Sequence, residues 1–330
     1  MTDRVIDTHA HYFPKPYLEL LATDRGKKYG FGYHLQPDGS FLIETPGGMR
    51  GPQPEKYYNL ELRLADMDAQ GVKMQGLSLT APMVYFADGE YSLDLCKAYN
   101  DATSASAQQH PDRLYGYMTL PMLDPDRALK ELARASKLPG LKGVYMGTHM
   151  EGHDLSDPLF EPVYEAIAAH KLPIFLHPVK PLGGPRLKAF HLGNLIGNPT
   201  ETATAAAHLI FSGVLDRHPT LEVSLPHAGG SLPELIGRFD HGAKVRKEMK
   251  HMTKAPSEYL RRFTYDTITH SADILKNLAA LVGTDRILLG SDYCADMGST
   301  DPVRIVDEAG FKGQDLARIL TDNAVKLLNL

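Results

Sequence analysis

Eight apolar runs of strand length alternate with segments of helical periodicity, and this alternation constrains the fold more than any other feature of the sequence. The apolar runs cover residues 5–7, 73–79, 114–120, 141–147, 173–177, 221–227, 263–267 and 287–292. The helical patterns cover residues 59–70, 94–110, 126–137, 157–170, 201–216, 271–281 and 316–328. Strands that alternate with helices are typical of parallel sheets with crossover connections. Eight repeats predict an α/β fold, a (β/α)8 TIM barrel forming one domain over residues 1–330, with a doubly wound sheet as the alternative.

One segment interrupts this alternation, directly after the first strand. Residues 12–54 carry no clear helical pattern. Two short apolar stretches, residues 31–33 and 41–43, flank Pro37-Asp38-Gly39, a turn sequence that favours a hairpin. We therefore expect residues 12–54 to be a small hairpin insertion that lies over the mouth of the barrel. A plain surface hairpin is the alternative.

The composition is that of a globular protein, and it limits the partners. Of the 330 residues, 43% are hydrophobic and 23% are charged, which is enough for one large core. The net charge of −5 and the pI near 6.3 argue against nucleic acid or an anionic membrane, whereas a small anionic substrate would need local Arg or Lys. Cys96 and Cys294 have no disulfide or metal-ligand spacing, and no secretory or membrane-spanning segment is visible in the sequence. We therefore expect a cytoplasmic protein.

Side chains that can bind a metal gather at the ends of the predicted strands. His9 and His11 are two residues apart on the first strand, so their imidazoles face the same way and can share one cation. His177 ends the fifth strand, His227 ends the sixth and Asp292 ends the eighth. In a barrel of this kind the active site lies at the carboxyl ends of the strands. Each residue alone has an ordinary structural explanation, but five at equivalent positions predict a site for a divalent metal.

These strand ends resemble those of the amidohydrolase superfamily. The resemblance covers nearly the full length and is strongest to the decarboxylating branch, typified by 2-amino-3-carboxymuconate-6-semialdehyde decarboxylase. The matching motifs are Asp7-Thr-His-Ala-His11, Thr119-Leu-Pro-Met122, Gly147-Thr-His149, Leu176-His-Pro178, His227-Ala-Gly-Gly230, Gly237-Arg-Phe239 and Gly290-Ser-Asp-Tyr293. The strand-end motifs are typical of the superfamily, whereas the glycine-rich and Gly-Arg segments indicate the branch.

The resemblance implies a site with one divalent metal ion. The metal ligands would be His9, His11, His177 and Asp292, with a water completing the coordination shell. Zn²⁺ is the expected ion, and Mn²⁺ or another divalent ion is the alternative. Members with two metals bridge them with a carboxylated lysine at the end of the fourth strand, whereas Lys142 lies near the start of that strand.

The resemblance also implies the reaction, a non-oxidative decarboxylation of a small unsaturated or aromatic carboxylic acid. His227 would be the general acid/base, acting on a metal-activated water or on the substrate carbon, and Asp292 would be catalytic as a ligand. A metal-dependent hydrolase or hydratase of a related substrate is the alternative, because it needs the same ligand set. A metal-binding structural or regulatory protein is a third hypothesis, and it would leave His227 without a role.

The expected substrate-binding residues are Arg50, Arg238 and His191. The two arginines match the resembled branch, whereas His191 and the substrate-facing Cys294 depart from it. Arg50 aligns with a substrate-binding arginine, and a planar guanidinium suits a carboxylate. Arg238 matches an arginine that crosses a dimer interface, so the resemblance implies a homodimer. His191 takes the place of a tryptophan, and Cys294 follows the eighth strand where the branch has proline. Plain solvation of Arg50 and a surface ion pair at Arg238 are the alternatives, and the exact acid stays open.

Overall fold

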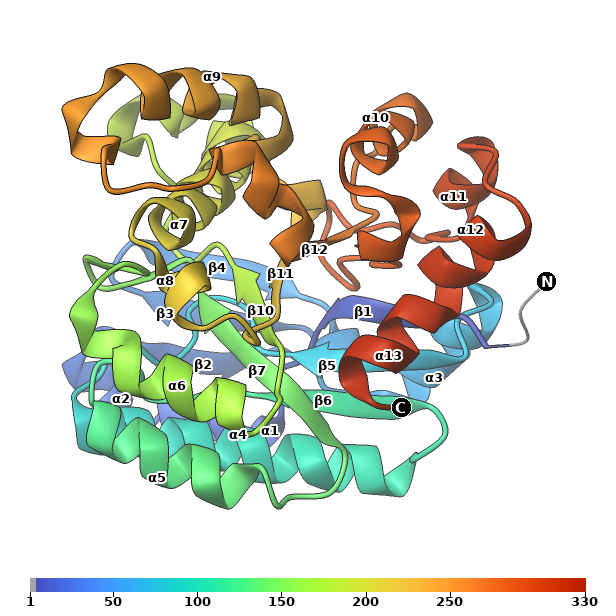
Figure 1. Cartoon of the computed structure of the whole chain (residues 1–330). Helices are drawn as coiled ribbons and strands as arrows, with labels where there is room; N and C mark the ends of the chain where they lie inside the picture. The colour runs from blue at the N-terminus through green and yellow to red at the C-terminus, as the bar shows by residue number, and fades with distance from the viewer. Residues whose placement is uncertain (1–3) are drawn as a thin grey trace.

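Eight parallel strands form one sheet at the centre of the computed structural model, which describes residues 4–330. Their order in the sheet is their order in the chain, and each strand overlaps one of the predicted apolar runs. The strands are β1 (Ile6–His11), β5 (Met74–Ser78), β6 (Leu114–Met118), β7 (Leu141–Gly147), β10 (Ile174–His177), β11 (Val223–Leu225), β12 (Phe263–Asp266) and β13 (Ile287–Leu288). This topology, with helices around the strands (Figure 1), confirms the predicted TIM barrel.

The barrel closes where β1 meets the segment that follows β13. The backbone N–H of Thr8 donates to the carbonyl of Leu289 at 2.9 Å, and that of Asp292 donates to the carbonyl of His9 at 2.8 Å. Ala10 and Tyr293 add an isolated parallel bridge. This closure brings the segment that carries Asp292 directly beside the end of β1.

The helices between the strands begin at capping residues that the sequence supplies. Asn59, Asp88 and Asp124 each accept hydrogen bonds from backbone N–H groups in the first turn of the following helix. In Figure 1, α4, α5 and α6 lie below the strands, and α7, α9 and α10 lie above them. The helices of the barrel are α3 (Leu60–Ala69), α4 (Gly89–Gln109), α5 (Pro125–Ala135), α6 (Glu161–Ala169), α7 (Asn198–Phe211), α8 (Val214–Arg217), α9 (Leu232–Val245), α10 (Ala272–Val282), α11 (Arg304–Glu308), α12 (Gly313–Ala317) and α13 (Asn323–Leu328). Within residues 4–330, no helix combines the length and the apolar character needed to cross a membrane.

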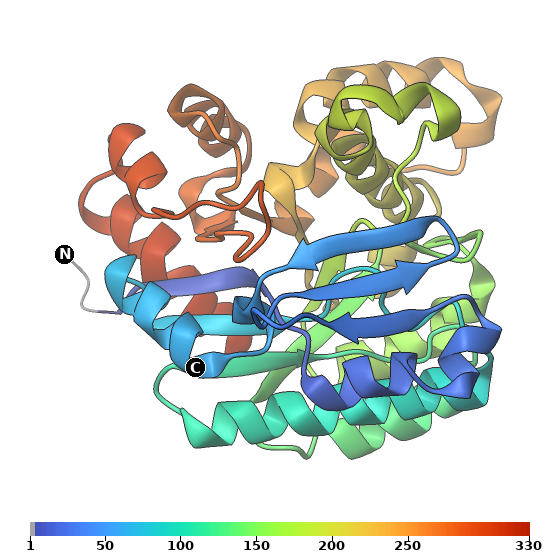
Figure 2. The ribbon, with the colours of Figure 1, turned by 180° about the vertical axis from the view of Figure 1, so that it is seen from behind.

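The segment after β1 holds a three-stranded antiparallel sheet instead of a two-stranded hairpin. Strands β2 (Gly32–Leu35) and β3 (Phe41–Thr45) pair on either side of the predicted turn. A third strand, β4 (Gly48–Gln53), pairs with β3, and Figure 2 shows the three strands side by side in blue. Because β4 reads Gly-Met-Arg-Gly-Pro-Gln, it lacks the alternation of apolar and polar residues that marks a strand.

The expectation that this segment has no helix is wrong. Helix α1 (Lys15–Leu21) and helix α2 (Asp24–Lys28) precede the three-stranded sheet. Helix α1 spans only seven residues, which is too short to show a clear helical period. It buries Tyr17, Leu18 and Leu21, so tertiary packing stabilises a helix that the local sequence pattern does not predict.

Candidate metal and substrate site

The structure brings the five predicted strand-end residues together at one end of the barrel. The ring centroid of His9 lies 5.1 Å from that of His11, 5.4 Å from that of His177 and 5.3 Å from that of His227. Asp292 joins them: its Oδ1 atom lies 2.9 Å from Nε2 of His11 and 3.5 Å from Nε2 of His9. Nε2 of His227 lies 3.7 Å from the other oxygen of Asp292.

One ligand atom from each of His9, His177, His227 and Asp292 lies within 4.8 Å of the others, a spacing that suits a single ion. This group contains His227 rather than His11, although His11 also contacts Asp292. The predicted ligands and the predicted acid/base therefore form one cluster. The division of roles between His11 and His227 stays a prediction.

The hydrogen bonds behind His9 and His177 leave their Nε2 atoms free for a metal. Nδ1 of His9 lies 2.8 Å from the carboxylate of Asp266, and Nδ1 of His177 lies 2.9 Å from the carbonyl of Pro178. A carboxylate and a carbonyl can only accept, so each Nδ1 carries the hydrogen. The lone pair of each neutral imidazole is then on Nε2, as a metal ligand requires.

His11 is oriented in the same way by a hydroxyl group. Its Nδ1 atom lies 3.2 Å from Oγ of Ser78, whose own hydrogen goes to the carbonyl of Ala10 at 2.9 Å. Ser78 is therefore an acceptor for His11, and the Nε2 atom of His11 is again the unprotonated one.

The charges in the cluster favour a cation. Burial lowers the pKa of His11 to about 4 and lowers that of His177 well below its ordinary value, so both imidazoles are neutral at pH 7. Burial opposes ionisation of Asp292, but the neighbouring His11, His227 and His9 hold its pKa well below the usual range. Burial alone would lower the pKa of His9, yet its hydrogen bond to Asp266 and the nearby carboxylate charges raise it.

Three buried polar atoms of the cluster have no hydrogen-bond partner within residues 4–330: Nε2 of His9, Oδ1 of Asp292 and Nδ1 of His227. Leaving such an atom unpaired costs about 1–3 kcal/mol. A divalent metal would pair the atoms of His9 and Asp292 at once, so the residues of this cluster fit the predicted ion.

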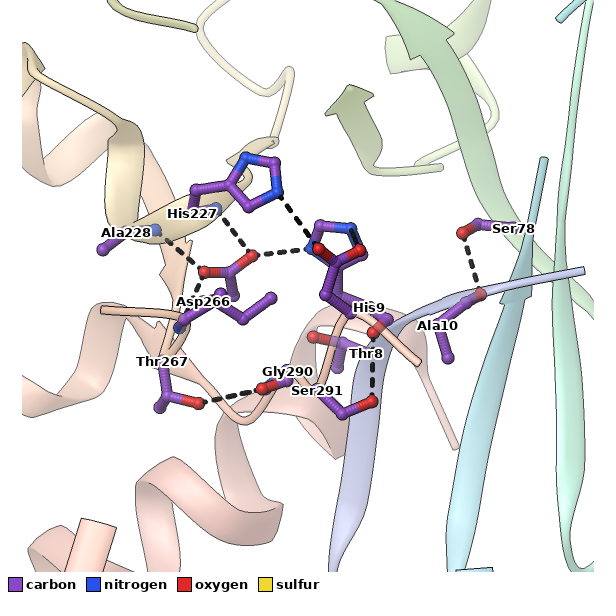
Figure 3. A network of polar contacts seen from close by, with 12 residues as sticks. Thr8, His9, Ala10, Ser78, His227, Ala228, Asp266, Thr267, Gly290 and Ser291 are labelled. Atoms are coloured by element: carbon purple, nitrogen blue, oxygen red, sulfur yellow. Dashed lines mark hydrogen bonds and ion pairs between the residues drawn. The ribbon is translucent and has the colours of Figure 1, made fainter. Parts of the chain in front are cut away.

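Asp266 is the site residue that the sequence reasoning missed. It ends β12, and its carboxylate accepts hydrogen bonds from Nδ1 of His9 at 2.8 Å and from the backbone N–H groups of His227 at 2.9 Å and Ala228 at 2.8 Å (Figure 3). These bonds hold His227 and Ala228 in left-handed conformations, with φ of 52° and 57°. The sequence feature that could have identified Asp266 is its position near the end of the seventh apolar run, which is equivalent to the positions of the other site residues.

Replacing Asp266 with asparagine is expected to lower metal affinity and turnover by roughly 10- to 100-fold, because the residue orients both a ligand and the backbone at His227. Metal titration and turnover of the purified variant measure the effect. Asp273→Asn is the matched control, since that aspartate is exposed on α10 and pairs with Lys276 at 3.1 Å, away from the cluster. Equal behaviour of the two variants would contradict the role assigned to Asp266.

A buried polar network beneath the cluster fixes the end of β1. The carboxylate of Asp7 accepts hydrogen bonds from the backbone N–H of Ser291 at 3.0 Å and from the side-chain amide of Gln75 at 2.8 Å. The buried Arg63 guanidinium donates to Gln75 at 2.7 Å and also to the carbonyl of His11. The first residue of the Asp-Thr-His-Ala-His motif is therefore structural, because it ties β1 to the segment that presents Asp292.

A cavity of about 680 Å³ opens above the cluster and receives two of the three predicted substrate-binding residues. Its floor includes His11, His177, His227 and Asp292, and β4 contributes Arg50 to its wall. His191 lines it from the loop after β10. The surrounding protein lowers the pKa of the Arg50 guanidinium by burial, although the side chain keeps contact with solvent.

Arg238 lies elsewhere, exposed on helix α9 and outside that cavity. A second cavity, of about 590 Å³, shares His227 and Asp292 with the first and is lined mainly by apolar residues such as Leu278. The cluster therefore faces one polar and one apolar space.

The family model described as amidohydrolase matches residues 6–330. The 2-amino-3-carboxymuconate-6-semialdehyde decarboxylase of Dictyostelium discoideum is 30% identical, covering 98% of this chain and 91% of that protein. The gamma-resorcylate decarboxylase of Rhizobium sp. (strain MTP-10005) is also 30% identical, over 71% of this chain and 76% of its own length. The crystal structure of 5-carboxyvanillate decarboxylase from Sphingomonas paucimobilis covers 100% of both chains, with a TM-score of 0.86 and 26% identity.

Proposed function

The chain belongs to the amidohydrolase family, and we propose that it is a metal-dependent, non-oxidative decarboxylase of a small unsaturated or aromatic carboxylic acid. The observation that carries this proposal is the cluster of His9, His11, His177, His227 and Asp292 at the floor of a cavity whose wall holds Arg50. The similarity to decarboxylases that match most or nearly all of the chain supports it.

The proposed reaction breaks the bond between the carboxyl group and its neighbouring carbon, releases CO2 and adds one proton to that carbon. His227 is suited to carry the proton, because its side chain is 17% exposed and lines the cavity beside Asp292. Its Nδ1 atom is buried, and no hydrogen bond to the rest of residues 4–330 occupies it. A divalent ion held by His9, His11, His177 and Asp292, which we propose to be Zn²⁺, would polarise substrate oxygens.

Release of CO2 from a panel of carboxylated muconates, hydroxybenzoates and heteroaromatic acids tests this reaction directly. Decarboxylation predicts CO2 and a product one carboxyl group smaller. Formation of hydrolysis or hydration products alone would overturn the proposal and favour a metal-dependent hydrolase or hydratase on the same scaffold.

We also propose that the protein is a cytoplasmic homodimer in which Arg238 of one subunit completes the substrate site of the other. The exposure of Arg238 on α9, away from the cavity of its own subunit, supports this assignment. An arginine at a carboxylate can form two parallel hydrogen bonds, so its loss would weaken substrate binding.

Subunit mixing provides the prediction for Arg238. Arg238→Ala and His227→Ala are each expected to be nearly inactive, but mixed dimers should regain activity because one of their two sites has both side chains. Turnover is measured after co-expression with two different affinity tags and isolation of the mixed dimer. Isolated mixed dimers without activity would show that each site is built within one subunit.

A further inference from the structure

Two cationic side chains line the 680 Å³ cavity without acidic partners. Arg50 comes from β4, and Lys188 comes from the loop after β10, directly after the short helix Gly184–Leu187. Nowhere in residues 4–330 does either side chain have an ion-pair or hydrogen-bond partner. By contrast, Lys180 in the same loop contacts Glu151 at 2.6 Å and does not line the cavity.

The loop conformation directs Lys188 and His191 to the same cavity. Leu187, Lys188 and His191 line it, whereas the intervening Phe190 is 86% exposed. Phe190 and His191 both have positive φ, 55° and 58°, which residues other than glycine rarely adopt. The neighbouring Arg186 is exposed and does not line the cavity, although it carries the same charge.

The cavity therefore offers two cationic side chains, Arg50 and Lys188, that can each bind an anionic group of a substrate. Apart from Asp292, which belongs to the metal cluster, Asp296 is the acidic residue of the lining, and it forms no ion pair with Arg50 or Lys188. The apolar cavity on the other side of His227 has no Lys or Arg in its described lining and includes Glu234. An anionic substrate is thus drawn into the cavity that Arg50 and Lys188 line.

We propose that Lys188 is a specificity-determining residue that binds a second anionic group of the substrate, a carboxylate that stays in the product. The substrate class is then a small unsaturated or aromatic dicarboxylic acid. One carboxyl group leaves as CO2 while its carbon neighbour takes a proton, and the other carboxylate remains paired with Lys188. This inference rests on the proposed function.

Two pairs of compounds that differ only in the second carboxylate test the inference. Binding is measured by calorimetry with isophthalate and benzoate, and turnover is measured with 2-hydroxyisophthalate and salicylate. The metal-loaded wild type is expected to bind isophthalate about tenfold more tightly than benzoate, and Lys188→Met is expected to remove this preference while binding of benzoate changes less than about twofold. Lys188→Arg should restore part of the preference, because the charge returns. Arg186→Met is the matched control, and it should leave the preference intact.

The outcomes separate this inference from the proposed function. Wild type that binds isophthalate no more tightly than benzoate would overturn the role of Lys188. So would an equal loss for both ligands in Lys188→Met, or an equal loss of preference in Arg186→Met. A preference that depends on Lys188, together with no CO2 from any acid of the panel, would instead overturn the proposed decarboxylation and leave Lys188 as an anion-binding residue.

Discussion

Asp292→Ala is expected to lose bound metal and activity together. The residue lies within reach of His9, His11 and His227, and it is the only carboxylate among the predicted ligands. Without it, neutral imidazoles must hold a divalent cation alone in a buried site, so metal affinity falls and turnover falls with it. Metal analysis of the purified variant, combined with CO2 release, measures both losses.

Asp296→Ala is the matched control for that loss. Asp296 lines the same cavity four residues further along the chain, but it is not in the metal cluster. This control is expected to keep its metal. An Asp292→Ala enzyme with full metal content and reduced turnover would show that Asp292 acts in catalysis without being a required ligand.

His227→Ala is expected to reduce turnover by about 10²- to 10⁴-fold, the range typical of a lost general acid/base, while metal content stays at the wild-type level. The physical reason is its position, because its imidazole belongs to the cluster and also lines both cavities. Metal analysis and single-turnover CO2 release, both made on the same preparation, measure the metal content and the loss of turnover.

The geometry makes the metal readout of this variant decisive, because His227 is close enough to His9, His177 and Asp292 to share an ion with them. Loss of metal in His227→Ala would identify it as a ligand and leave His11 with a different role. His270→Ala is the control, since that histidine lines the apolar cavity but lies outside the cluster. It should retain both metal and most of the activity.

The barrel could be predicted because its strands are buried on both faces and therefore form continuous apolar runs. The elements that were missed are those whose stability comes from tertiary contacts. Strand β4 contains two glycines and a proline, and helix α1 is a single short amphipathic segment. Helix α9 carries Gly237 and Gly242, which weaken the helical signal of its sequence.

The same distinction applies to the candidate site: the residues placed by strand order could be predicted, and those placed by tertiary contacts could not. The clustering of His9, His11, His177, His227 and Asp292 follows from strand order, because the carboxyl ends of parallel strands meet at one rim. Asp266 was not predicted as a site residue because it acts on other site residues through hydrogen bonds that only the fold creates. In the sequence, nothing distinguishes Lys188 from the other lysines. Only the path of its loop in the structure places it in the lining of the cavity.

The most direct test of the metal centre is CO2 release measured as a function of bound divalent metal during removal by a chelator and reconstitution. Activity is predicted to fall in proportion to the metal lost and to return when Zn²⁺ or another active divalent ion is added. A preparation that remains fully active after all metal has been removed would contradict the account.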